Sequence, residues 1–475
     1  MESDISILYA LCCDRFGSEP AGNVLLPAAG GDRKYYRFSM TDGKTLLGVV
    51  ADRKDEARAF VKLSEVFRLN GVNVPEIYGY TDDYSHYLVE DLGDDSLFSS
   101  LSSPDIERLV KDTLRMLVRM QTVPESVWKQ VVAFRPMASR LVMWDLNYFK
   151  YEFLKTSGID FDEERLEDDF ESIVQRLLSG DKSTWGFMMR DCQSRNVMLH
   201  PDPYFIDFQG GRLGPCLYDA VSLLWQAKAG FSQDFREKML EFYAKEFASA
   251  RGLNAGELIA RTDIFVLFRT LQVLGAYGFR GLVQKRAHFI QSIPGALLNL
   301  RTLIDRGAID EFGELKSVAM RILEQRKFFP ENNDRLHVKV FSFSYKKGYP
   351  EDLSGNGGGF MFDCRGMHNP GRYDQYKPLT GRDAPVIEFL KERGEADVFA
   401  QKAFEIVAPS VETYLRRGFS SLQIGFGCTG GRHRSVYCAE SVSRKLADRF
   451  PDAVIELIHR EHGIHEIVKC DFPKF

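Results

Sequence analysis

The sequence predicts an α+β fold of two lobes, followed by a smaller α/β domain. Strand-like segments dominate residues 1–92, whereas apolar side chains at helical spacing dominate residues 93–330. A Pro and a polar run break the helical pattern near residue 330, and strand-like and helix-like segments alternate through residues 336–475. A chain of 475 residues exceeds what one hydrophobic core usually holds, so we expect a small lobe, a large lobe and a separate domain.

The small lobe is expected to consist of strands around two helices. Its elements are a helix at residues 4–16, strands at 23–27, 35–40 and 45–51, a helix at 55–69, a strand at 74–78, and a strand with a hinge at 87–94. The turn between the first two strands contains Gly30 and Gly31, whose backbone N–H groups are suited to contact phosphate groups. An ordinary turn is the alternative interpretation of this pair.

Three polar side chains of the large lobe have a spacing that phosphoryl transfer can use. Asp191 comes first, Asn196 follows five residues later, and Asp207 follows a hairpin whose strands are expected at 197–199 and 204–206. In this chemistry one carboxylate orients the acceptor hydroxyl, while an Asn and a second Asp hold Mg²⁺ against the phosphates. A single loop Asp is usually only solvated, but the ordered set favours a site.

Longer motifs surround this set: R-D-C-Q-S-R-N at 190–196, I-D-F-Q at 206–209 and G-P-C-L-Y-D-A-V-S-L-L at 214–224. They resemble the aminoglycoside phosphotransferase/choline kinase superfamily, and within it the likeness is greatest to the anomeric sugar kinases of peptidoglycan recycling (AmgK). The resemblance implies a protein-kinase-like bilobal fold and an enzyme that transfers a phosphoryl group to an alcohol. Met189 replaces the His of such motifs, which concerns the geometry of the loop more than the chemistry.

The resemblance implies ATP and Mg²⁺ as cofactors and gives each site residue a role. Asp191 and Arg195 are the expected catalytic residues, Asn196 and Asp207 the expected Mg²⁺ ligands, with Gln209 assisting the site and Asp219 bracing the loop. The expected nucleotide contacts are Gly30, Gly31, Arg33, Glu90 and Leu92.

The third strand, at 45–51, lacks the Lys with which ordinary kinases contact ATP. Arg33, Lys34 or Arg53 is therefore expected to supply the positive charge. Glu56 and Glu65 either orient such a cation or face solvent, and the second interpretation is favoured.

The rest of the large lobe is predicted to be helical. Helices are expected at 106–121, 232–250, 256–279, 283–292, 293–306 and 311–325. Residues 141–155 are unusually aromatic, and we expect Asp145 and Tyr148 to contact a sugar substrate. Packing inside the lobe is the alternative for most of these aromatic side chains.

The final domain is expected to contain strands at 337–345, 358–364, 422–426 and 453–458, with helices at 386–391, 397–417 and 433–449. The third strand ends in a glycine turn that leads into a helix, an arrangement that favours an anion because free N–H groups converge there. The spacing is not that of a Walker P-loop. The expected anion-binding residues are Cys428, Thr429, Gly430, Gly431, His433, Arg434 and Ser435.

This turn, together with residues 341–346, 362–370 and 379–383, resembles the C-terminal domain of RapZ proteins. That resemblance implies a domain that senses glucosamine-6-phosphate, in proteins that also bind a small regulatory RNA. RNA binding is the less favoured role here, because the net charge is −5 and no aromatic side chains interleave with the basic ones. The histidines at 459, 462 and 465 are expected to lie at the surface or face a phosphate rather than bind a metal.

Composition points to a cytoplasmic protein. The eight cysteines form no C-x-x-C pair, and no apolar run is long enough for a membrane span. The expected function is therefore an ATP-dependent amino-sugar kinase for N-acetylmuramate or N-acetylglucosamine in cell-wall recycling, phosphorylating C1, with a phosphosugar-sensing domain. The alternatives are a kinase for another small alcohol or an aminoglycoside, and a pseudokinase that serves as a sensor or RNA adaptor.

Overall fold

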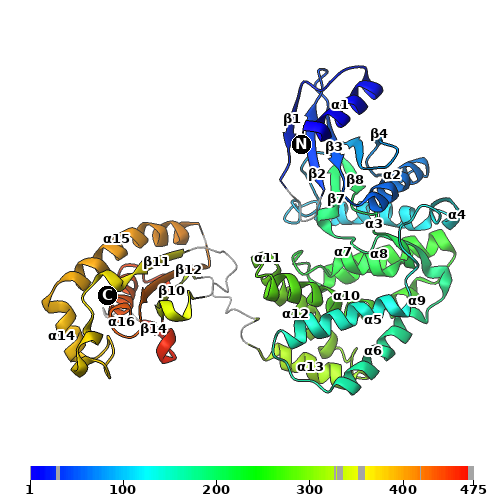
Figure 1. Ribbon diagram of the computed structural model, residues 1–475. Coiled ribbons are helices and arrows are strands. Elements are labelled where there is room, and N and C mark those ends of the chain that lie inside the picture. The colour runs from blue at the N-terminus through cyan, green and yellow to red at the C-terminus, as the bar shows by residue number, and fades with distance from the viewer. Residues whose placement is uncertain are drawn as a thin grey trace. The chain divides into compact units, whose positions relative to one another are not determined.

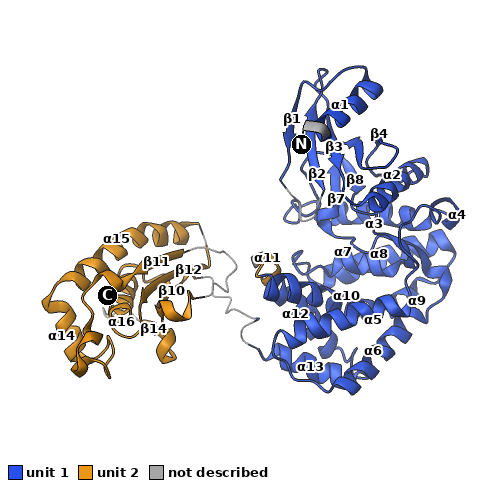
Figure 2. Cartoon of the chain, in the orientation of Figure 1, with its two compact units in different colours: residues 1–284, 292–328 blue, residues 285–291, 329–475 orange. Residues whose placement is uncertain are grey.

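The computed structural model describes residues 2–27, 33–325, 328, 335–350, 359–417 and 419–468. The chain forms two compact units, one of residues 1–284 and 292–328 and the other of residues 285–291 and 329–475 (Figure 2). Figure 1 shows the helices and strands of each unit. The predicted α+β fold of two lobes with a following α/β domain is confirmed.

The small lobe of the first unit is built on a five-stranded antiparallel sheet. The strands are β1 (Gly22–Leu25), β2 (Lys34–Ser39), β3 (Thr45–Val50), β4 (Ile77–Tyr80) and β5 (His86–Glu90), in the order β1-β2-β3-β5-β4. Helix α1 (Glu2–Phe16) buries Leu8 and Cys12 against Phe38, Leu46 and Leu88 of the sheet. Helix α2 (Lys54–Leu69) buries a second apolar face that includes Phe60 and Phe67.

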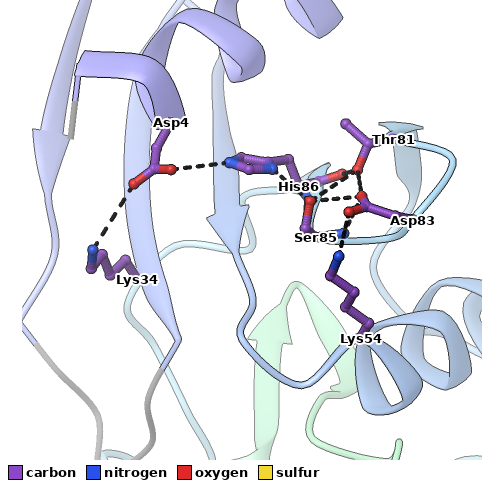
Figure 3. Close-up of polar contacts among 7 residues, drawn as sticks. All are labelled: Asp4, Lys34, Lys54, Thr81, Asp83, Ser85 and His86. Carbon is purple, nitrogen blue, oxygen red and sulfur yellow. Dashed lines mark hydrogen bonds and ion pairs between the residues drawn. The ribbon is translucent and has the colours of Figure 1, made fainter.

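Polar contacts fasten both helices of the small lobe to the sheet (Figure 3). The carboxylate of Asp4 in α1 lies 3.4 Å from Nε2 of His86 in β5 and 4.0 Å from Nζ of Lys34 in β2. At the start of α2, Nζ of Lys54 donates to Asp83 at 2.6 Å, in the turn between β4 and β5. This contact is the first cause of the lowered pKa of Asp83, and the hydroxyl of Ser85 is the second. The start of α2 is thus held at that turn.

The large lobe is helical, and α10 (Thr262–Tyr277) runs through its centre with most of its side chains buried. The other helices are α3 (Ile106–Thr122), α4 (Glu125–Trp128), α5 (Ser139–Tyr148) continued by a π-helix (Phe149–Lys155), α6 (Glu163–Leu178), α7 (Leu217–Leu224), α8 (Gln233–Arg251), α9 (Ala255–Ala260), a π-helix at Gly278–Val283, α12 (Ile293–Asp305) and α13 (Gly313–Leu323). A Cβ at position 278 would lie 2.2 Å from the carbonyl oxygen of Glu152, so Gly278 permits the close approach of the two π-helices.

Two helix predictions for this lobe are wrong. Of the helix expected at 283–292, only residues 287–290 are α-helical. The segment 256–279 was expected to form a single helix, but α9 ends at Ala260, α10 begins at Thr262, and the backbone widens to a π-helix from Gly278. Residues 287–290 form a short helix, α11 (Ala287–Ile290), that groups with the second unit. Apolar spacing alone does not reveal such breaks, because both pieces bury the same kind of face.

Two short antiparallel strand pairs carry the loops around the predicted site. Strand β6 (Trp185–Met188) pairs with β9 (Arg212–Pro215), and β7 (Val197–His200) pairs with β8 (Asp202–Phe205). The predicted hairpin after Asn196 is confirmed, with Val197 opposite Phe205.

The second unit contains one five-stranded sheet in the order β11-β12-β10-β13-β14. The four strands β10 (His337–Ser344), β11 (Gly359–Asp363), β12 (Ser421–Cys428) and β13 (Val454–His459) are parallel, and β14 (Ile464–Val468) is an antiparallel edge. Helices α14 (Ala384–Glu392), α15 (Glu395–Arg416) and α16 (Arg434–Arg449) accompany the sheet. The edge strand β14 was not predicted, because its polar side chains gave no apolar run.

Within the described part of the chain, no helix is both long enough and apolar enough to cross a membrane.

Candidate active site

The loop between β6 and β7 and the turn after β8 bring the three predicted polar side chains together. Nδ2 of Asn196 donates to the backbone carbonyl of Asp191 at 2.9 Å and lies 3.5 Å from Oδ2 of Asp207. Nε2 of Gln209 donates to the other carboxylate oxygen of Asp207 at 2.7 Å. The amide of Asn196 therefore connects the backbone of Asp191 with the carboxylate of Asp207.

The backbone is strained at two positions of this site. Arg190 has a φ of 73° and Asp207 a φ of 61°, both in the left-handed region that non-glycine residues rarely adopt. Each such residue costs on the order of 1 kcal/mol, so neighbouring contacts must hold it in place. For Asp207 the contact is Phe208, which is fully buried and whose ring centroid lies 5.1 Å from that of Phe60 and 5.7 Å from that of Phe67 in α2.

A buried carboxylate braces the loop that carries Asp191. Asp219, in α7, accepts the backbone N–H of Met189 at 2.7 Å and that of Arg190 at 2.9 Å. Gln121 of α3 lies 3.5 Å from the same carboxylate. Because the brace uses the backbone of residue 189 and not its side chain, Met at this position leaves the brace intact.

Burial raises the pKa of Asp219 to about 7, against a value near 4 in the unfolded chain. Between these values the folded protein binds more protons than the unfolded one, so the free energy of unfolding contributed by this group falls as pH rises from about 4 to about 7. We therefore expect the free energy of unfolding of the first unit to fall by roughly 2–3 kcal/mol between pH 5 and 7.5 because of Asp219. Urea titrations of the wild type and Asp219→Asn at both pH values measure it: the decline attributable to position 219 must be absent from the variant, and equal pH dependence in both proteins contradicts the assignment.

A second buried network reaches Asp191 from α10. Nη1 of Arg269 donates to Oη of Tyr218 at 2.9 Å and to Oε1 of Gln272 at 2.8 Å, and it lies 3.7 Å from the carboxylate of Asp191. Burial opposes the charge of Arg269, but Tyr218 and Asp191 raise its pKa, so the guanidinium stays ionised. Arg269 was not predicted from the sequence, where its signal was a charged side chain in the middle of an apolar stretch of α10.

Asp145, predicted to contact substrate, belongs to the same network. Its carboxylate is buried and accepts Nη2 of Arg190 at 3.1 Å and Nε2 of Gln272 at 2.9 Å. These contacts favour a bracing role, and direct contact with a substrate remains a prediction. Tyr148 is half-buried one turn further along α5, with its ring 6.2 Å from the ring of Trp144, whose side chain is exposed.

Of the three cations considered for the missing Lys, Arg33 is the one whose charge interacts with Asp207. Its guanidinium lies 3.4 Å from the carboxylate of Glu56 in α2. Burial lowers the pKa of Arg33, but Tyr87, Tyr35 and Asp207 raise it above the ordinary value. The favoured interpretation, that Glu56 only faces solvent, is therefore wrong: Glu56 pairs with a cation and orients it.

Of the other two cations, Lys34 faces α1, and Arg53 shares Glu56 with Arg33 but is mostly exposed. Nζ of Lys34 lies 4.0 Å from Asp4, and Arg53 pairs with Glu56 at 2.5 Å while most of its side chain is exposed. Glu65, the other carboxylate considered, pairs with Lys62 at 2.9 Å.

The remaining predicted nucleotide contacts lie around the hinge. The carboxylate of Glu90 accepts the backbone N–H of Glu76 at 3.0 Å, so it secures β4, and Leu92 is buried. Arg37 of β2 pairs with Asp91 at 2.7 Å and with Asp94 at 2.9 Å, which ties the hinge to the sheet. Gly30 and Gly31 lie outside the described residues. Arg195, predicted to assist catalysis, stacks at 4.0 Å over the ring of Phe98.

The oxygen donors of the site suit a hard cation that also binds phosphate. Desolvation by the surrounding protein raises the pKa of Asp207, and the nearby carboxylates of Asp191 and Glu56 add to this increase. The hydrogen bond from Gln209 and the charge of Arg33 oppose it. Excess negative charge at one point is relieved by a bound cation. Mg²⁺ in nucleotide sites is commonly held by one or two carboxylates and the phosphates, which Asn196 and Asp207 could match. The described residues contain no cluster of three or more His, Cys, Asp or Glu side chains with metal-binding geometry.

The residues predicted to bind an anion in the second unit follow the end of β12 and begin α16. Sγ of Cys428 lies 3.1 Å from Oγ of Ser435, the second residue of α16. Burial alone would raise the pKa of the Cys428 thiol. The Ser435 hydroxyl, the backbone N–H groups of Ser435 and Arg432, and the charge of Arg434 outweigh burial, so the pKa is lowered. Gly431 has a φ of 64°, and the carbonyl of Thr429 accepts Oγ of Ser344 at 2.8 Å. His433 is buried with Nε2 2.9 Å from the carbonyl of Tyr376.

Comparison with known families assigns each unit separately. Residues 25–253 match the phosphotransferase enzyme family, and residues 336–463 match the RapZ C-terminal domain. Both resemblances drawn from the motifs are thereby confirmed.

Curated relatives match part of the chain. A nucleotide-binding protein of Acidobacterium capsulatum is 35% identical over 131 residues, which are 27% of this chain and 41% of that protein. One from Staphylococcus haemolyticus is 30% identical over 173 residues, 36% of this chain and 54% of its own length. The chain thus spans about half the length of the curated relatives it matches.

Among solved structures, a choline kinase of Cryptosporidium parvum is similar with a TM-score of 0.47 and 11% identity, covering 66% of this chain and 99% of that one. A macrolide 2′-phosphotransferase of Brachybacterium faecium has a TM-score of 0.42 and 14% identity, covering 61% of this chain and 97% of that one.

Proposed function

We propose that this chain is an ATP- and Mg²⁺-dependent kinase that phosphorylates a hydroxyl of an amino sugar, N-acetylmuramate or N-acetylglucosamine, with C1 as the expected position. The observation that carries the proposal is the convergence of Asp191, Asn196 and Asp207 within the segment that matches the phosphotransferase family. Phosphoryl transfer needs positioning and charge neutralisation more than covalent help, and these side chains provide both.

Asp191 would accept or orient the proton of the acceptor hydroxyl, and its carboxylate is exposed and so accessible to a substrate. Asn196 and Asp207 would hold Mg²⁺, which neutralises charge on the phosphates when bound. Asp219 fixes the backbone before Asp191, and Arg269, whose Nη1 lies 3.7 Å from the Asp191 carboxylate, would hold that carboxylate in place. Both of these side chains act as positioning residues.

Arg33 is the cation that would contact the phosphates in place of the absent strand Lys, with Glu56 orienting it. Replacing Arg33 with Ala is expected to raise the KM for ATP about tenfold or more, because a charge-assisted hydrogen bond to phosphate is lost. Steady-state kinetics at varied ATP concentration measure the change. Arg53→Ala is the matched control, since Arg53 pairs with the same Glu56 but is largely exposed; an equal rise in KM for both variants argues against the assignment.

The amino-sugar assignment rests on the likeness of the motifs to anomeric sugar kinases and on the aromatic pair of Trp144 and Tyr148 beside Asp145. An exposed aromatic ring is suited to stack on the face of a sugar. The competing acceptors are small alcohols such as choline and aminoglycosides. A pseudokinase would need an incomplete donor set, whereas here Asp191, Asn196 and Asp207 are all present and adjacent.

An acceptor screen tests the proposal. Full-length protein is incubated with ATP, Mg²⁺ and each of N-acetylmuramate, N-acetylglucosamine, choline and kanamycin, and ADP formation is followed. We expect turnover with the two N-acetylated sugars, and phosphorus NMR of the product should place the phosphate on C1. Turnover confined to choline or kanamycin, or no turnover at all, rejects the amino-sugar assignment.

For the second unit, we infer an anion site that takes a phosphosugar such as glucosamine-6-phosphate and thereby regulates the kinase. The N–H groups around Cys428 and the buried guanidinium of Arg434 support this assignment. Millimolar ligand should raise the melting temperature or alter the kinase rate. RNA is less suited to this surface: His459 and Arg434 are buried, and Arg444 pairs with Glu440.

A further inference from the structure

The segment from Cys428 to Ser435 places a thiol, an arginine and a hydroxyl at one spot. Strand β12 ends at Cys428, five loop residues follow, and α16 starts at Arg434 and Ser435. The loop folds back over its own first residue, because the backbone N–H groups of Arg432 and Ser435 both donate to the Cys428 sulfur. Gly431, with a φ of 64°, permits the reversal, and a Cβ there would lie 2.9 Å from the backbone nitrogen of Ser344.

The surroundings of Cys428 favour its thiolate more than those of an ordinary buried cysteine do. Two backbone N–H groups, the hydroxyl of Ser435 at 3.1 Å and the charge of Arg434 favour the thiolate, and together they outweigh burial and lower its pKa. Cys364 of the same unit shows the contrast: burial raises its pKa, and a hydrogen bond with Cys438 raises it further. A thiolate at the start of a helix is a strong nucleophile.

Arg434 has a buried donor without a partner among the described residues. Its side chain is 5% exposed; Nη1 donates to the carbonyls of Arg365 and Met367 at 2.9 and 2.8 Å, while Nε is buried without a partner. A buried donor left unpaired is costly, so its persistence near Cys428 indicates a ligand with acceptor oxygens.

A route to this donor passes over Gly430. A Cβ built there would meet nothing within 4 Å, so the backbone on that side is open to a ligand. Thr429 and Gly430 are exposed, whereas Cys428 is 3% exposed at the floor of the loop. A tetrahedral dianion entering over Gly430 would meet the loop N–H groups first and the sulfur last.

We propose that Cys428 is the nucleophile of a second activity, the hydrolysis of phosphomonoesters. The thiolate attacks the phosphorus of R–O–PO₃²⁻, an S–P bond forms, the P–O bond to the alcohol breaks, and the departing oxygen takes a proton from water to give R–OH. A water molecule then attacks phosphorus, the S–P bond breaks, and inorganic phosphate and the thiolate are released. The net reaction consumes one water per ester and needs no other co-reactant.

Arg434 and the loop N–H groups would hold the non-bridging oxygens in both steps. Ser435 would donate to the sulfur as it leaves in the second step, because its hydroxyl is already 3.1 Å away. The activity goes beyond the proposed kinase and opposes it in direction, and it uses none of the residues of the first unit.

The test uses the full chain with Asp191→Ala, so that transfer from ATP does not interfere. p-Nitrophenyl phosphate, glucosamine-6-phosphate and N-acetylglucosamine-1-phosphate are supplied without ATP, and released phosphate is measured. We expect release that falls at least about a hundredfold in Cys428→Ser. In Ser435→Ala, breakdown of the intermediate should become slow enough for mass spectrometry to find a phosphoryl group on Cys428.

Cys438→Ser is the matched control, since Cys438 is buried in the same unit and outside the loop; it should retain release. Thermal unfolding of each variant in phosphate buffer verifies that the second unit is folded and still binds the anion. Release that is equal with and without the Cys428 sulfur overturns the proposal. Phosphate binding with no hydrolysis of any of the three esters also overturns it, and leaves an anion site without chemistry.

Discussion

Replacing Asp191 with Asn is expected to lower the kcat of the kinase about 10³-fold while leaving the KM for ATP nearly unchanged. The amide keeps the size of the side chain but cannot accept the proton of the acceptor hydroxyl. It also loses the ion pair with Arg269, which lies 3.7 Å from the carboxylate. The backbone carbonyl of Asp191 still accepts the hydrogen bond from Asn196, so the cation ligands should stay in place.

Steady-state kinetics with N-acetylglucosamine as the acceptor measure the effect, and ATP-induced thermal stabilisation verifies nucleotide binding. Asp202→Asn is a matched control, because Asp202 begins β8 of the same hairpin and is exposed. It should retain wild-type turnover. A kcat within tenfold of wild type in Asp191→Asn would refute the role assigned to this carboxylate.

Replacing Asp207 with Asn is expected to lower turnover by a similar factor of about 10³, but through the cation. The substitution removes one negative charge from the pair that would hold Mg²⁺, and the new amide competes for the hydrogen bond with Gln209. The apparent affinity for Mg²⁺ should therefore fall together with kcat, whereas Asp191→Asn should leave Mg²⁺ affinity unchanged.

A Mg²⁺ titration of ATP-dependent thermal stabilisation separates the two variants. We expect wild type and Asp191→Asn to give the same midpoint and Asp207→Asn to require more Mg²⁺ or show no stabilisation. Unaltered Mg²⁺ dependence in Asp207→Asn would show that the cation is held elsewhere.

The parts of the site that sequence predicted are those that lie close together along the chain. Asp191, Asn196 and Asp207 are joined by one loop and one hairpin, so turn residues and short apolar runs suffice to bring them together. The strand, turn and helix that carry the proposed anion site of the second unit could be predicted for the same reason, because they follow one another along the chain.

The parts that sequence did not predict depend on contacts between distant segments. Arg269 reaches Asp191 only because α10 is buried through the middle of the large lobe. Glu56 was expected to face solvent, since a carboxylate on a helix usually does, and only the fold places Arg33 against it. Local patterns carry no information on which helix face meets which loop.

The packing of Phe208 has a practical consequence for dissecting this protein. Its ring is fully buried against Phe60 and Phe67, so the turn that presents Asp207 is seated on a helix from the other lobe. A fragment cut at the hinge would expose three aromatic rings to water and leave the left-handed backbone of Asp207 without its support. Any minimal catalytic fragment must therefore begin upstream of α2.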